Sequence, residues 1–132
     1  MSFFGKEYAF DRQENFQDFV DSLGLSAEQA QGFVNYHPNQ RLTQDADSLT
    51  LTTTTPQTKN ELNFKSGVSF EDKVADRKCT TTYTLDGNTL TQVQKFEDGA
   101  EFTFIRVFSD SELVVTITSN KYNGTARRYY KA

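Results

Sequence analysis

Turn signals recur at short intervals from residue 41 to the end of the chain. The segments between them are rich in Thr, Val, Phe and Tyr, which are residue types that favour strands. Asp-Gly and Asn-Gly steps are strong hairpin signals, and they occur at Asp86-Gly87, Asp98-Gly99 and Asn123-Gly124. No helical pattern interrupts this region, so we expect its strands to form an antiparallel meander.

A first short helix is predicted after an opening strand at Tyr8 to Phe10. Asn15 is a favourable N-cap, and Asp18 lies three residues later, where an acidic side chain stabilises a helix N-terminus. The apolar residues of this segment fall at helical spacing and form one stripe: Phe16, Phe19, Val20 and Leu23. Gly24 is expected to end the helix.

A second short helix is predicted to begin at Ser26, which forms a capping box with Gln29, and to end before Pro38. Helices of about two turns are too short to be stable alone, so strands must cover their apolar sides. Eight or more strands with two helices inserted after the first predict an up-and-down barrel with a helical lid. A two-sheet sandwich is also compatible with this pattern.

Composition narrows the class of protein. The chain has 132 residues, which suits one domain over residues 1–132, and its net charge of −4 argues against a nucleic-acid surface. Cys79 is the only cysteine, so no disulfide forms within the chain, as is usual in a reducing compartment. The sequence shows no secretory signal and no apolar run of membrane-spanning length, and we expect a cytoplasmic protein.

Arg106 lies in a strand whose alternation is informative. Phe102, Phe104 and Phe108 share its face, while Thr103, Ile105 and Val107 share the other. Three phenylalanines facing water are less favourable than one buried guanidinium with a partner, so we expect Arg106 to point inward.

The last strand repeats a basic-aromatic step. Arg127 and Tyr129 lie on one face, and Arg128 and Tyr130 lie on the other. A guanidinium and a phenol side by side on an inner face present several donors to a carboxylate. The alternation alone does not say which pair faces inward.

Nearly the whole chain resembles the intracellular lipid-binding proteins, and most closely the fatty-acid-binding proteins. The resemblance runs in order through several motifs: Asn15-Phe16 with Asp18-Phe19-Val20 and Ser22-Leu23-Gly24, Asn60-Glu61, Phe64-Lys65, Gly67-Val68 with Phe70, Ala75-Asp76-Arg77-Lys78, Thr84-Leu85-Asp86-Gly87, Arg106, Leu113, Thr116 and the closing Arg127-x-Tyr129. There are departures: Gln57 stands where an aromatic portal residue is common, Gln17 replaces a usual acid, and Tyr8 is displaced by one residue.

The resemblance implies a mainly β fold, a ten-stranded antiparallel up-and-down barrel with a two-helix cap. It implies a ligand carboxylate held by Arg106, Arg127 and Tyr129, which leaves Arg128 on the surface. It further implies that Phe16, Val20 and Ala75 line the cavity or its portal.

The function expected from this resemblance is non-catalytic binding and transport of long-chain fatty acids. Retinoic acid is the alternative ligand, because it also presents a carboxylate. An esterase is disfavoured, since no nucleophile–base pair or nucleophile elbow is visible. We expect a monomer with no cofactor, no metal site and no nucleic-acid partner. Transient contact with an anionic membrane is a further hypothesis, based on Lys59, Lys65, Arg77 and Lys78 near the expected portal.

Overall fold

The computed structural model describes residues 3–74 and 77–132. In this part of the chain, ten strands and two helices follow one another as β1 (Glu7–Glu14), α1 (Phe16–Asp21), α2 (Ala27–Val34), β2 (Asn39–Asp45), β3 (Ser48–Thr54), β4 (Lys59–Lys65), β5 (Phe70–Val74), β6 (Arg77–Asp86), β7 (Thr89–Phe96), β8 (Glu101–Phe108), β9 (Glu112–Ser119) and β10 (Tyr122–Lys131).

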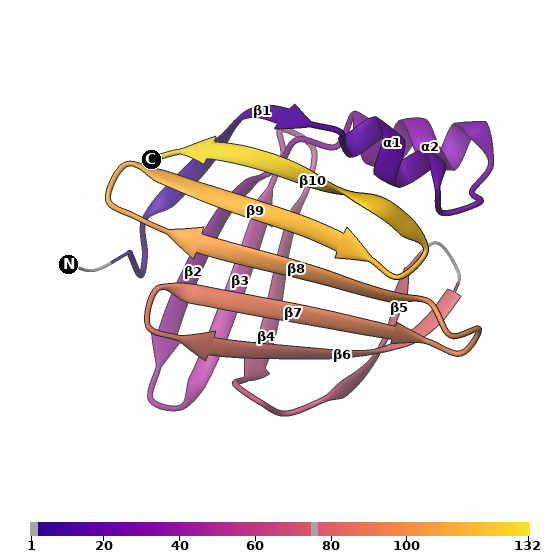
Figure 1. Ribbon diagram of the computed structural model, residues 1–132. Helices are drawn as coiled ribbons and strands as arrows, with labels where there is room; N and C mark the ends of the chain where they lie inside the picture. Colours follow the sequence, from indigo (N-terminus) through magenta and orange to yellow (C-terminus); the bar gives the residue numbers. More distant parts are fainter. Residues whose placement is uncertain (1–2, 75–76) are drawn as a thin grey trace.

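All ten strands belong to one antiparallel sheet with the order β4-β3-β2-β1-β10-β9-β8-β7-β6-β5. The sheet curls over, so that β2, β3 and β4 form a layer behind β6 to β9, and both helices lie at one end (Figure 1). This confirms the predicted ten-stranded barrel with a two-helix cap and excludes two separate sheets. Neither helix in the described ranges is long and apolar enough to cross a membrane.

The first and last strands of the chain, β1 and β10, pair with each other in the middle of the strand order. β1 pairs with β10 from Ala9↔Lys131 to Glu14↔Arg127, and with β2 at Glu7↔Arg41 and Tyr8↔Gln40. The two edge strands, β4 and β5, are joined by side chains instead. The Tyr83 ring stacks on Phe64 with a centroid distance of 4.4 Å and on Phe70 at 6.2 Å, so aromatic packing spans this seam.

The helices cover the open end through the apolar stripe of α1. The Phe19 ring meets the edges of Phe102 and Tyr122 at centroid distances of 5.6 and 5.9 Å. The capping box of α2 is confirmed: the Ser26 hydroxyl accepts from the Gln29 amide at 3.2 Å, and the Gln29 side chain accepts from the Ser26 amide at 3.3 Å.

Two local predictions differ from the structure. Asn15 occupies the N-cap position of α1 as predicted, with φ of 57°, but its side chain donates to the carbonyl of Thr125 at 3.1 Å and does not cap the helix. The left-handed backbone aims the amide at β10, away from the helix N-terminus. The predicted turn at Asn123-Gly124 lies inside β10, where a Cβ on Gly124 would come within 2.9 Å of the Tyr122 ring. The chain turns instead at residues 120–121.

The end opposite the helices is closed by aromatic side chains. Phe108 is fully buried, stacks on Phe3 at 4.9 Å and meets the Tyr8 ring at 5.6 Å. The Tyr8 hydroxyl donates to the Ser109 carbonyl at 2.7 Å. Part of the apolar core therefore fills this end of the barrel.

Candidate functional site

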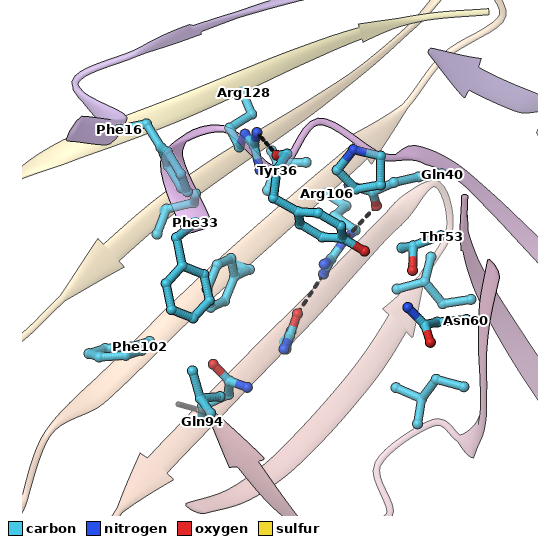
Figure 2. Close-up of a pocket in the computed structure, with 18 of the residues that line it drawn as sticks. Phe16, Phe33, Tyr36, Gln40, Thr53, Asn60, Gln94, Phe102, Arg106 and Arg128 are labelled. Atoms are coloured by element: carbon cyan, nitrogen blue, oxygen red, sulfur yellow. Dashed lines mark hydrogen bonds between the residues drawn. The ribbon is translucent and has the colours of Figure 1, made fainter. Parts of the chain in front are cut away.

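An internal cavity of about 480 Å³ lies between the two layers of the sheet and under the helices. Its lining is largely apolar, with a small number of polar side chains (Figure 2). The apolar and aromatic members are Phe16, Phe19, Val20, Leu23, Phe33, Tyr36, Pro38, Leu51, Leu62, Val74, Tyr83, Phe102, Phe104, Val115, Ile117 and Tyr130. The polar members are Gln40, Thr53, Asn60, Glu61, Gln92, Gln94, Arg106 and Arg128.

Arg106 points into this cavity from β8, as the sequence predicted, and is 8% exposed. Its Nε donates to Gln40 Oε1 at 3.1 Å, and its Nη1 donates to Gln92 Oε1 at 2.8 Å (Figure 2). Both acceptors are neutral amides. Among the described residues, no carboxylate forms an ion pair with Arg106. A buried positive charge without a compensating anion is costly, so this position favours an anionic ligand.

The last strand is oriented opposite to the prediction. Arg128 and Tyr130 are 7% and 1% exposed and line the cavity, whereas Arg127 and Tyr129 are only partly buried and do not. Tyr129 lies on the outer face, where the Arg12 guanidinium sits 4.0 Å from its ring centroid. The expectation that Arg127 and Tyr129 face the interior is therefore wrong.

Pairing with β9 explains this orientation. Arg128 lies opposite Val115 and Tyr130 lies opposite Leu113, and both partners are buried. Residues that face each other across an antiparallel pair project to the same side of the sheet. The inner face of β9 therefore places Arg128 and Tyr130 inside, and their sequence neighbours outside.

Arg128 is held by aromatic rings and one carbonyl. Its Nη2 donates to the carbonyl oxygen of Tyr36, and its guanidinium lies 4.4 Å from the Phe16 ring and 4.8 Å from the Phe10 ring. Its Nε makes no hydrogen bond within the described residues. Burial lowers the pKa of Arg128, but an arginine remains protonated near neutral pH. This is a second inward-facing cation with unused hydrogen-bonding capacity.

The two arginines lie in one row across the sheet. Val115 pairs with Arg106 on one side and with Arg128 on the other. Their Cα atoms are therefore separated by two strand spacings, about 10 Å. The same wall of the cavity thus presents two guanidinium groups and, two residues along β10 from Arg128, the Tyr130 phenol.

The predicted portal residues are placed in part. Phe16 and Val20 line the cavity from α1. Ala75, the third predicted portal residue, lies outside the described residues. Sequence reasoning missed the inner glutamines Gln40, Gln92 and Gln94, although Gln92 and Gln94 share the strand face of the buried Leu90 and Phe96.

Comparison with known proteins found close relatives over the whole length. No family model matches the chain. Fatty acid-binding protein 1 of Manduca sexta is 44% identical over 133 residues and is covered completely, as is this chain. The solved structure of a fatty-acid-binding protein from Manduca sexta has a TM-score of 0.91 and 41% identity, and covers 99% of this chain and 100% of that one. The solved structure of the fatty acid-binding protein from brain tissue of Drosophila melanogaster has a TM-score of 0.86 and 37% identity. The match covers 99% of this chain and 100% of that one.

Proposed function

This chain belongs to the family of fatty-acid-binding proteins, and from that premise we propose that it is a non-catalytic carrier of long-chain fatty acids. In this proposal the ligand lies in the internal cavity with its carboxylate toward Arg106, Arg128 and Tyr130. The observation that carries it is the buried guanidinium of Arg106, whose protein partners are neutral amides and not a carboxylate.

The proposed head-group site differs from the trio of Arg106, Arg127 and Tyr129 expected from the sequence. Arg106 keeps its role, while Arg128 and Tyr130 take the places of Arg127 and Tyr129, because only the former pair lines the cavity. Arginine suits this role because its planar fork matches a carboxylate and remains charged. A charge-assisted hydrogen bond contributes about 1.5–3 kcal/mol, less the cost of desolvation.

The acyl tail supplies most of the binding free energy in this proposal. Burial of each methylene contributes about 0.8 kcal/mol, so a chain of roughly sixteen carbons gives on the order of 10 kcal/mol before the costs of association. The lining rings of Phe16, Phe33 and Phe102 offer a suitable apolar surface (Figure 2). The tail thus determines affinity, and the head-group site determines orientation and the preference for acids.

We further propose a monomeric, single-domain carrier in the cytoplasm. The buried free thiol of Cys79 is compatible with a reducing compartment. Transient contact with an anionic membrane remains part of this proposal through exposed basic residues such as Lys59 and Lys78.

The decisive measurement compares oleate with the corresponding alcohol in a fluorescent-ligand displacement assay. We expect the acid to bind more tightly, and Arg128→Leu to weaken oleate binding roughly tenfold or more while the alcohol changes little. Arg127→Leu, one residue away on the outer face, is the matched control and should leave both affinities unchanged. Equal binding of acid and alcohol by the unmutated protein contradicts the proposal, and displacement of oleate by retinoic acid at lower concentration favours a retinoid instead.

A further inference from the structure

One polar side chain in the cavity is not used by the head-group site. Gln94 projects from β7, is 5% exposed and lines the cavity, and its amide makes no hydrogen bond with any described residue (Figure 2). Gln92, two residues earlier on the same face, differs because its carbonyl oxygen accepts from Arg106. Gln94 therefore carries a free donor and a free acceptor inside the protein.

Sheet pairing places this amide far from the Arg106 guanidinium. Arg106 lies opposite Leu90, whereas Gln94 lies four residues further along β7, opposite Phe102. Four residues of an antiparallel strand span about 13–14 Å. A ligand whose carboxylate lies near Arg106 therefore passes Gln94 well along its tail.

The surroundings of Gln94 make its free amide costly beside a plain hydrocarbon. Its cross-strand partner Phe102 packs on Phe19, and its other partner, Thr81, already donates to Asp72 at 3.0 Å. A saturated tail that covers the amide removes water from it and offers no replacement hydrogen bond, which weakens binding. A tail with an oxygen at this level replaces the lost hydrogen bonds.

The opposite wall has a second polar row, which is less enclosed. Gln40, Thr53 and Asn60 lie side by side on β2, β3 and β4 and all line the cavity. Gln40 already accepts from Arg106, and Asn60 is exposed to solvent. Among these cavity residues, Gln94 is therefore the buried position at which a polar group on the ligand gains most from a hydrogen bond.

We propose that Gln94 is a specificity-determining residue that favours acyl chains carrying a hydroxyl group along the tail over plain saturated chains. This inference rests on the proposed function, since it requires the carboxylate to lie near Arg106. The amide of Gln94 accepts from, or donates to, the hydroxyl, while the aromatic rings around it contact the methylenes on either side.

The test compares stearic acid with a series of hydroxystearic acids in which the hydroxyl moves along the chain. We expect one group of mid-chain positions to bind about two- to tenfold more tightly than stearic acid, the range of one net hydrogen bond. In Gln94→Leu this preference disappears and stearic acid itself binds more tightly. Gln94→Met is a second apolar substitution, so that a packing defect peculiar to leucine does not decide the outcome.

Gln44→Leu, an exposed position on β2 that does not line the cavity, is the matched control and should retain the preference. If stearic acid binds but no hydroxyl position is favoured, or if the preference survives in both Gln94 variants, the inference is wrong and the proposed function stands. If the unmutated protein binds neither stearic acid nor any hydroxystearic acid, the proposed function fails and this inference fails with it.

Discussion

The guanidinium of Arg128 donates a hydrogen bond to the carbonyl oxygen of Tyr36, which ties the inner face of β10 to the chain that leaves α2. A stacked pair supports the same connection, because the His37 ring lies 4.1 Å from the ring of Phe10, and Phe10 also contacts Arg128. In the proposed binding mode, the ligand carboxylate would bond to the same guanidinium that holds this carbonyl. We therefore expect occupancy of the proposed head-group site to affect the position of the chain that leaves α2.

This connection predicts a local change in dynamics. In Arg128→Leu, backbone amides of residues 33–38 should exchange with solvent faster than in the unmutated protein, because the segment loses its bond to β10. Hydrogen–deuterium exchange with mass spectrometry measures this directly. Arg127→Leu should leave the exchange of these residues unchanged, and equal acceleration in both variants would show that Arg128 does not anchor the segment.

Replacing Arg106 and replacing its acceptor Gln92 should affect the free energy of unfolding differently. Gln92→Leu leaves Nη1 of a buried guanidinium without its acceptor and should lower the free energy of unfolding by about 1.5–3 kcal/mol. Arg106→Leu removes the buried charge and should be neutral or stabilising in the ligand-free protein, although it weakens fatty-acid binding. Urea unfolding of the two variants tests this. A larger loss of stability in Arg106→Leu than in Gln92→Leu contradicts the assignment of Arg106 as a charge kept for the ligand.

Tyr83 should make the protein less stable in alkali. Burial raises the pKa of Tyr83, the Asp72 carboxylate adds to the rise, and the Arg106 charge opposes it. Because the folded-state pKa lies above the unfolded value of about 10, the contribution to stability is complete below that pH and is lost as the pH rises through the folded-state pKa. In Tyr83→Phe the fall in melting temperature above about pH 10 should be shallower. Tyr36→Phe is the control. If the melting temperature of Tyr36→Phe falls with pH as shallowly as that of Tyr83→Phe, the prediction is refuted.

Much of the fold could be predicted because its signals are local or involve strong burial preferences. The three phenylalanines of β8 could not all face water, which fixed the inner face of that strand. Ser26 and Gln29 satisfy each other within one turn, so their capping box required no distant contact. Asn15 shows the limit, since its side chain is recruited by Thr125, which lies on β10 and is remote in the sequence.

The face of β10 was predicted wrongly because its sequence contains the same motif twice. Arg-Arg-Tyr-Tyr reads as Arg-x-Tyr from either Arg127 or Arg128, and alternation only groups the residues into pairs. A usable signal was the register with β9. Any hairpin with a two-residue turn places Arg128 and Tyr130 opposite the apolar face that contains Leu113 and Val115. A two-residue turn at Asn123-Gly124 gives the same facing as the observed turn at residues 120–121, so the misplaced turn does not account for the error.

The inner glutamines were missed for a different reason. Glutamine is usually exposed, so the alternation of Leu90, Gln92, Gln94 and Phe96 did not mark the two central residues as buried. The burial of Gln92 is understandable once Arg106 is known to donate to it, whereas Gln94 is buried because it lines the cavity. Whether a polar residue faces a cavity depends on the side chains that it meets across the barrel. The alternation within a single strand does not contain this information.

The pairing of β1 with β10 also makes the proposed head-group site depend on the continuity of the sheet. The strand that supplies Arg128 and Tyr130 is the one that joins β1 to β9. Without β10, strands β1 to β4 and strands β5 to β9 would share no strand pairing, and two of the three residues of the proposed site would be missing. One strand therefore carries both the continuity of the cavity wall and most of the proposed anion site.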